Sequence, residues 1–157
     1  MNIRTAEEKD IDKFLDLLSQ VLEIHAAIRP DYFIPGTTKY SREELKTMLK
    51  DENRLIYSAV DENDSVIGYA FCEIRHQPDR ENMVPFKSVY IDDLCVDKQI
   101  RGQHIGQALF DHVCQEAKEL GCYEITLNVW EGNDNARIFY EHMGFRPRST
   151  TMEYIID

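Results

Sequence analysis

The stretch most able to bind an anion is a basic, glycine-spaced turn at residues 96–109, "VDKQIRGQHIGQAL". Gly102 can take up the dihedral angles that let successive N–H groups point into one concavity. A helix beginning here adds unpaired amides and the positive end of its dipole, and Arg101 adds a full charge. These features predict a phosphate-binding turn. The same spacing also fits a plain strand-to-helix turn in which Gly106 only eases packing against a sheet.

Two other nucleotide-binding motifs do not match this turn. A P-loop ends in Gly-Lys-Ser/Thr, and a dinucleotide fingerprint needs G-x-G-x-x-G after an early strand. Neither pattern occurs at residues 96–109. The sequence therefore does not support either class.

Composition and charge limit the classes of partner that this chain is expected to bind. The formal net charge is −11, which argues against nucleic acid as the main partner, because phosphate backbones are bound by clustered Lys and Arg. The four cysteines form no C-x-x-C pair, and the histidines form no i, i+4 pair with a helical carboxylate, so we expect buried reduced thiols and no metal. No apolar run approaches the roughly 20 residues that span a bilayer, and the first ten residues lack a signal-peptide core. We expect a cytoplasmic protein with no membrane partner.

Hydrophobic periodicity predicts one domain over residues 1–157 that alternates strands and helices. A strand at 2–5 precedes a helix opened by a Thr5 to Glu8 capping box and ended before Pro30, and a second box, Ser41 to Glu44, opens a shorter helix. Two strands around "DENDS" form a hairpin. The strand "SVYIDDLCV", a helix from Gln103 to Leu120 and the strand "YEITLNV" form a parallel crossover. A helix capped by Asn133 and a final strand within 145–157 complete the order.

Two separated motifs resemble those of the GNAT superfamily of acyl-CoA N-acyltransferases. The turn matches the family's first motif at Gln99, Arg101, Gly102 and Gly106, with His104 in place of the middle glycine of the common form. The stretch "NVWEGNDNARIFYEHMGF" matches the family's second signature at six positions: Asn133, Ala136, Phe139, Tyr140, Gly144 and Phe145. The resemblance implies an α/β (α+β) fold with a central mixed, mostly antiparallel sheet flanked by helices, in which strands 88–96 and 123–129 splay apart.

The resemblance also implies acetyl-CoA as the cosubstrate, without a metal. The pantetheine arm would lie between the splayed strands, against main-chain groups of Leu94, Cys95 and Val96. The pyrophosphate would lie on the turn at Arg101, Gly102, Gln103, His104, Ile105, Gly106 and Gln107. Polar contacts to the arm would come from Asn128, Asn133 or Asn135, although each asparagine also fits a simple capping role.

Tyr140 is the residue that the resemblance assigns to catalysis. In the family, a tyrosine at this place donates a proton to the departing CoA thiolate. A phenol with a pKa near 10 is still a donor at neutral pH. The alternative is a core aromatic, since Tyr140 shares helical spacing with Ala136, Phe139 and Met143.

A base is also needed, because an amine substrate arrives protonated, with a pKa near 10. Asp92 and Asp93 lie mid-strand, where carboxylates are unusual, and we expect them on opposite faces of the strand. Asp92 is preferred because it shares parity with Leu94 and Val96. A bulge in this strand would reverse the choice, and water can also relay the proton.

The predicted function is N-acetyl transfer to a primary amine of a small molecule or peptide by direct attack in a ternary complex. The family resemblance places the acceptor beside the loop 25–40, with His25, Tyr32, Phe33 and Tyr40. A CoA-binding regulatory module of the same fold and an enzyme that uses a longer acyl-CoA remain as alternatives. A homodimer through edge strands or the 76–87 loop is also open.

Overall fold

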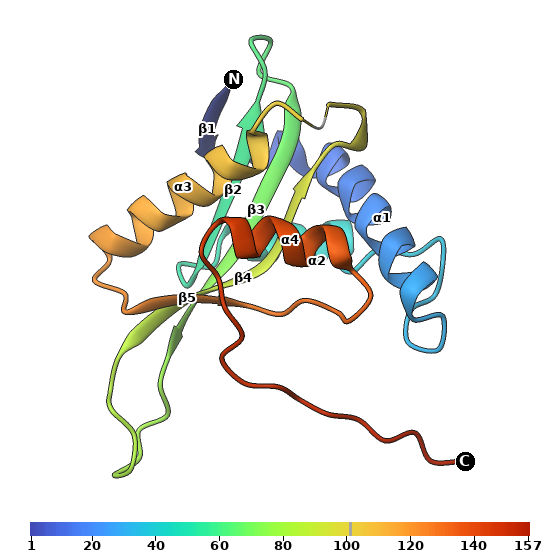
Figure 1. Cartoon of the computed structure of the whole chain (residues 1–157). Helices are drawn as coiled ribbons and strands as arrows, with labels where there is room; N and C mark the ends of the chain where they lie inside the picture. The colour runs from blue at the N-terminus through green and yellow to red at the C-terminus, as the bar shows by residue number, and fades with distance from the viewer. Residues whose placement is uncertain (101) are drawn as a thin grey trace.

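The computed structural model describes residues 1–100 and 102–157, whose strands form one mixed sheet (Figure 1). In chain order these are β1 (Asn2–Thr5), β2 (Arg54–Val60), β3 (Val66–His76), β4 (Lys87–Val96) and β5 (Glu124–Leu127). They lie side by side in that same order. Every neighbouring pair is antiparallel except β4 and β5, which are parallel. The predicted mixed, mostly antiparallel sheet with one crossover is confirmed.

Helices cover both faces of this sheet (Figure 1). The helices α1 (Ile11–Ile28) and α2 (Arg42–Leu49) lie on one face, and α3 (Ile105–Glu119) lies on the other, where α4 (Asp134–His142) packs beside it. Short 3-10 turns precede α1 at η1 (Glu8–Asp10) and α3 at η2 (Lys98–Ile100). Within the described residues, the helices are too short or too polar to cross a membrane.

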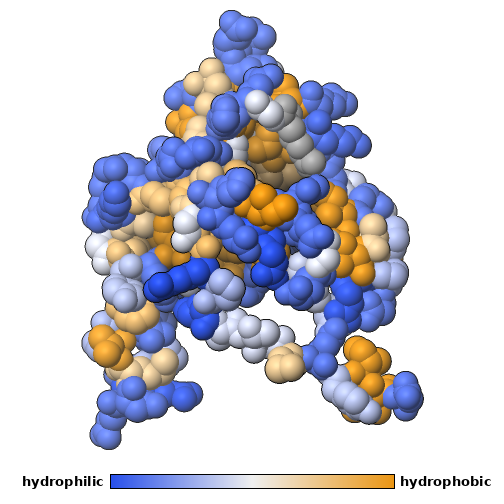
Figure 2. Space-filling view, in the orientation of Figure 1, coloured by the Kyte–Doolittle hydropathy of each residue, from blue (hydrophilic) through white to orange (hydrophobic). Residues whose placement is uncertain are grey.

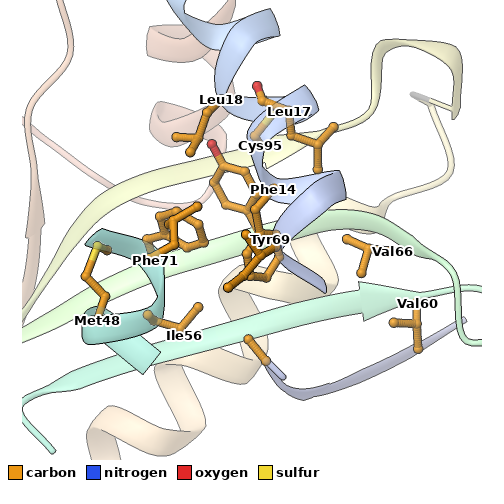
Figure 3. Close-up of a cluster of buried hydrophobic side chains, with 13 residues drawn as sticks. Phe14, Leu17, Leu18, Met48, Ile56, Val60, Val66, Tyr69, Phe71 and Cys95 are labelled. Carbon is orange, nitrogen blue, oxygen red and sulfur yellow. The ribbon is translucent and has the colours of Figure 1, made fainter. Parts of the chain in front are cut away.

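Three aromatic rings pack together among the aliphatic side chains of the core under α1 (Figure 3). The ring of Phe14 meets Tyr69 and Phe71 edge-on, at centroid distances of 5.6 and 5.1 Å, and these two rings stack on each other at 4.1 Å. On the opposite face, α3 buries a stripe at four-residue spacing: Ile105, Leu109, Val113 and Ala117. The helical spacings in the sequence therefore identify the faces that pack on the sheet.

One of the two predicted capping boxes is present. At α2, the Glu44 N–H donates to Ser41 Oγ at 3.1 Å and the Ser41 N–H donates to the Glu44 carboxylate at 3.1 Å. The predicted box from Thr5 to Glu8 is wrong, because Thr5 belongs to β1 and pairs with Tyr57.

Asp10 explains where the first helix begins instead. Its carboxylate accepts hydrogen bonds from Arg4 at 2.8 and 2.9 Å, from Ser58 at 2.8 Å and from the Glu7 N–H at 2.9 Å. These contacts fix the 3-10 turn before α1. A long-range ion pair thus outweighs the local capping signal.

The predicted final strand within 145–157 is also wrong. The chain leaves α4 through Gly144, at φ +102°, and runs on as an extended segment outside any strand (Figure 1). Its residues from Arg146 onward are exposed. A strand needs a neighbour to pair with, and within the described residues this segment has none.

Gly68 allows close packing near the start of β3. A Cβ added there would lie 2.8 Å from the main-chain oxygen of Cys95 and 3.4 Å from Leu109 Cδ1. We expect Gly68→Ala to lower the free energy of unfolding by about 2 kcal/mol, the range for overpacking a core. Urea unfolding at an unchanged m-value measures this, with exposed Glu62→Ala as the control. A midpoint equal to that of the parent would show that the sheet yields without cost.

Candidate active site

The parallel pairing of β4 and β5 is short. It runs from Ser88 beside Glu124 to Ile91 beside Leu127, whereas β4 continues to Val96. Beyond Ile91 the two strands part, which confirms the predicted splay. The predicted cosubstrate contacts Leu94, Cys95 and Val96 lie on this diverging part of β4, paired on their other side with β3.

A β-bulge changes the positions of the two strand carboxylates. Asp93 pairs with Phe71, and Ile91 pairs with Cys72, so Asp92 is an extra residue in β4. Such a bulge breaks the alternation of side chains along a strand. The expectation of two opposite faces is therefore wrong.

Both carboxylates are hydrogen-bonded to tyrosines of one core cluster. Asp92 accepts from Lys39 Nζ at 2.9 Å and from the Tyr40 hydroxyl at 2.5 Å, while Asp93 accepts from the Tyr69 hydroxyl at 2.5 Å. Tyr69 belongs to the core under α1, and Tyr40 packs against that same core. The bulge thus brings two acidic groups to one side of the site.

The two aspartates differ in their electrostatic surroundings. Burial raises the pKa of Asp93 to about 6, and the charge of Asp92 adds to the rise, while the Tyr69 hydrogen bond and the Lys39 charge oppose it. Asp92 has an ammonium group directly beside it. Asp93 therefore changes charge closer to neutral pH than a carboxyl group ordinarily does.

Tyr140 lies near the end of α4, half-buried between two other rings. Its ring centroid is 5.1 Å from that of Phe139 and 5.5 Å from that of Phe145. Burial, and after it the negative charge of Asp93, raise the pKa of the Tyr140 phenol above its usual value. The hydroxyl therefore remains a proton donor at neutral pH.

The glycine turn has a left-handed backbone at two positions. Gly102 has φ +90°, and His104, the N-cap of α3, has φ +58°. Helix α3 begins at Ile105 rather than at Gln103, because the left-handed His104 cannot continue a helix. Arg101 lies outside the described residues. The sequence correctly marks the turn but places the start of the helix two residues early.

Histidine at position 104 occupies a conformation that glycine normally favours. Left-handed backbone costs a residue with a Cβ roughly 1–2 kcal/mol, although His adopts it more often than most residues do. The family's common glycine at this place is explained by this φ value. The His104 side chain is exposed, as are those of Gln103 and Gln107.

We expect Gly102→Ala to lower the free energy of unfolding by about 1 kcal/mol, because its φ of +90° disfavours any side chain. Among the described residues other than its chain neighbours, no heavy atom lies within 4 Å of the added Cβ, so crowding by them does not contribute. Thermal unfolding measures the stability of the variant, and calorimetric titration measures its affinity for CoA, which is expected to bind at this turn. Gly36→Ala, also at positive φ with open space, is the control: a matching loss of stability with unchanged CoA affinity is expected there.

Gly106 faces α4 as well as the sheet. A Cβ at this position would lie 3.1 Å from Phe139 Cζ and 3.7 Å from Val96 Cγ2. The missing side chain lets Phe139 approach α3, which fixes the neighbouring Tyr140 beside the splayed strands. Gly106 therefore links the turn to the predicted catalytic residue.

The three predicted asparagines have different surroundings. Asn133 caps α4 by accepting from the Ala136 N–H at 3.4 Å, as the capping alternative predicts. Asn128 Nδ2 donates to the Tyr90 hydroxyl at 3.0 Å, and Asn135 is exposed in the first turn of α4. Contacts of all three with a cosubstrate stay predictions.

An aromatic cluster forms most of the predicted acceptor wall. The ring centroid of His25 lies 5.3 Å from that of Phe33. The ring of Trp130 meets those of Tyr32 and Phe33 edge-on, at centroid distances of 5.1 and 5.3 Å. Tyr40 lies elsewhere, beside Asp92. Trp130 was missed by the sequence reasoning. Its place three residues after β5, where the strands part, is the signal that could have found it.

Arg29 belongs to this cluster. Its guanidinium lies 4.4 Å from the ring centroid of Tyr32, and it pairs with Asp31 at 2.8 Å and Glu153 at 2.6 Å. Burial lowers the pKa of His25, and the charge of Lys39 lowers it further. The wall is thus aromatic, and the charge of Arg29 is balanced by two carboxylates.

Known proteins share this architecture. A family model described as "Acetyltransferase (GNAT) family" matches residues 21–145. A crystal structure of a BH1408 mutant from Bacillus halodurans superposes with a TM-score of 0.95 and 31% identity, covering 99% of each chain. That superposition therefore includes most of the extended segment after α4.

Curated relatives differ in their acceptors. A glucosamine 6-phosphate N-acetyltransferase of Trypanosoma brucei brucei is 33% identical over 63 residues, which are 40% of this chain and 41% of that protein. The peptidyl-lysine N-acetyltransferase YjaB of Escherichia coli is 28% identical over 119 residues, 72% of this chain and 68% of that one. The chain spans less than half the length of the first relative. Both names specify transfer to an amine.

Proposed function

Because the chain belongs to the GNAT acetyltransferase family, we propose that it transfers an acetyl group from acetyl-CoA to a primary amine. The acceptor is a small molecule or a peptide, and the amine attacks the thioester directly in a ternary complex. Residues 1–157 act as a single N-acetyltransferase domain. The observation that carries this proposal is that the β4–β5 ladder ends at Ile91 and Leu127 while β4 runs on to Val96, which lies beside Gly106 in the first turn of α3.

The turn before α3 fits the pyrophosphate of CoA. Ala108 donates the first intrahelical hydrogen bond, to His104 O at 3.0 Å, so the N–H groups of Ile105, Gly106 and Gln107 precede the helical ladder. Such groups and the helix dipole bind phosphate. We place the pyrophosphate here, with Arg101, Gly102, Gln103 and His104, and the pantetheine arm along Leu94, Cys95 and Val96.

Two side chains are suited to the proton transfers. Tyr140 gives its phenolic proton to the CoA thiolate as the thioester breaks. The amine loses its proton to a carboxylate, directly or through water, and the sequence favours Asp92 for this role. The raised pKa of Asp93 favours that residue instead, because a base with a pKa near the working pH accepts protons more effectively.

Asp92 then has a different task. Its bonds to Lys39 and Tyr40 tie the loop after α1 to β4. That loop carries the aromatic wall, so Asp92 positions the acceptor side of the site. We therefore assign to Asp93 the role of accepting the proton of the amine, and to Asp92 the role of positioning the loop after α1.

An acceptor screen tests the proposed activity. Acetyl-CoA is incubated with amino sugar phosphates, lysine peptides and polyamines, and the release of free thiol is followed. We expect one amine class to raise release above hydrolysis, and longer acyl-CoA donors to be slower. If CoA binds in calorimetry but no amine raises release, the chain is a CoA-binding module and the proposal is wrong.

A further inference from the structure

Asp97 is a buried carboxylate that takes no part in the proposed reaction. Charged residues ordinarily lie at the surface, and Figure 2 shows hydrophilic residues over much of the face that it draws. Among the described residues, only two charged ones are buried, Asp10 and Asp97, which are 3% and 4% exposed. Asp10 holds the start of α1, whereas Asp97 lies between β4 and η2. The burial of Asp97 therefore needs an explanation of its own.

Asp97 fixes the backbone that leads into the turn before α3. Its carboxylate accepts from the Gln99 N–H at 3.1 Å, and its main-chain oxygen accepts from the Ile100 N–H at 3.0 Å. Its own N–H donates to Ile67 O of β3 at 2.9 Å. Asp97 thus sets the geometry of η2, and soon after η2 the chain takes up the left-handed backbone of Gly102.

Helix α1 holds the same carboxylate from the other side. Lys13 Nζ donates to Asp97 at 2.6 Å, and the side-chain amide of Gln20 donates to it at 3.4 Å. The side-chain oxygen of Gln20 also accepts from the Lys98 N–H at 3.1 Å. Figure 1 shows the chain after β4 passing beside α1. Side chains of one helix face therefore bond both to Asp97 and to the backbone of η2.

Lys13 supplies the charge that balances Asp97. Burial acts to raise the pKa of Asp97, but the hydrogen bonds from Lys13 and from the Gln99 N–H lower it below its ordinary value. The Asp97 side chain is 6% exposed, whereas Asp16, the second partner of Lys13, is 54% exposed. Removing the cation from a buried carboxylate is far more costly than removing it from an exposed one. A change at Lys13 is therefore transmitted through Asp97 to η2.

We propose that Lys13 and Asp97 are positioning residues for the cosubstrate: their ion pair fixes η2, and η2 fixes the N–H groups that bind the pyrophosphate. This inference rests on the proposed binding of CoA at the turn before α3. Neither side chain contacts CoA in this arrangement. Main-chain N–H groups bind phosphate when they point into one concavity. A shift of η2 therefore weakens the site although each group that contacts CoA is still present.

Calorimetric titration of CoA tests the proposal with the whole chain. We expect Asp97→Asn and Lys13→Gln each to weaken CoA binding about 10-fold, as when a buried hydrogen bond between charged groups is lost. Lys13→Arg keeps a cation beside Asp97 and should bind CoA as tightly as the parent protein. The matched controls Asp64→Asn and Lys9→Gln break another aspartate–lysine bond of 2.6 Å, away from the turn. These controls should keep the affinity of the parent protein.

The double variant Lys13→Gln, Asp97→Asn tests whether the two residues act as a pair. It should bind CoA about as weakly as Asp97→Asn alone, because one interaction is lost in both. Losses that multiply in the double variant would show two separate effects and overturn the proposal. If Asp97→Asn does not fold, Lys13→Gln decides the question, since its side chain is 34% exposed.

Thermal unfolding of each variant distinguishes positioning from a purely structural role. Lower stability with an unchanged affinity for CoA would show that the ion pair only stabilises the fold, and this inference would be wrong. That result would leave the proposed function intact, because the parent protein still binds CoA. A parent protein that does not bind CoA would overturn both the proposed function and this inference.

Discussion

Replacing Tyr140 by Phe should lower kcat about 10²- to 10³-fold and leave the affinity for CoA within about twofold, the loss typical of a general acid. The ring that packs between Phe139 and Phe145 is kept, and only the hydroxyl is removed. Without a donor, the thiolate must leave unprotonated. Steady-state thiol release measures kcat, and calorimetry measures CoA binding.

Tyr140→Phe also distinguishes a catalytic role of Tyr140 from a role in core packing alone. If Tyr140 were only a core aromatic, Tyr140→Phe would keep its activity, and a kcat within threefold of the parent would contradict the assignment. Tyr123→Phe is the matched control, because Tyr123 is 75% exposed and its ring packs against Phe86, at 4.9 Å between centroids, rather than against Tyr140. Its kcat should equal that of the parent protein.

Replacing Asp93 by Asn should lower kcat/KM about 100-fold at pH 7 and remove the acidic limb of its pH profile. In the parent protein, kcat/KM should rise with pH through about 6, because only the ionised carboxylate accepts the proton of the amine. An Asn side chain neither ionises nor accepts that proton. Initial rates from pH 5 to 8 at low amine concentration give both profiles, after correction for the ionisation of the amine.

Asp92→Asn is the control for this experiment. It should keep an acidic limb, moved to lower pH because the charge of Asp92 no longer helps to raise the pKa of Asp93, and it should change mainly KM, because Asp92 ties down the loop through Lys39 and Tyr40. The opposite result, with the limb lost in Asp92→Asn and kept in Asp93→Asn, would return the role to Asp92.

The raised pKa of Asp93 also links stability to pH. Its ordinary value in an unfolded chain is about 3.9, so between about pH 4 and 6 the unfolded chain releases this proton before the folded one does. Asp93 therefore makes the fold less stable as pH rises through that window. Asn at this position should remove that contribution.

The sequence alone determined the features that depend on local chemistry. Helical spacing in α1 and α3, the cap at Ser41 and the glycine at the turn follow from side-chain size, polarity and backbone freedom, all properties of neighbouring residues. The two family motifs predict the splayed strands and a role for Tyr140 for the same reason, because each motif lies within one continuous stretch.

Only the tertiary structure decided features that depend on distant partners. The start of α1 follows Asp10, held by Arg4 and Ser58, and the carboxylate pair depends on a bulge opposite Phe71 that no local pattern encodes. Trp130 joins the acceptor wall through contacts with Tyr32 and Phe33, about a hundred residues earlier in the chain. Segment 146–157 has the alternation of a strand but forms none here, because pairing requires a neighbouring strand that the sequence of one element cannot supply.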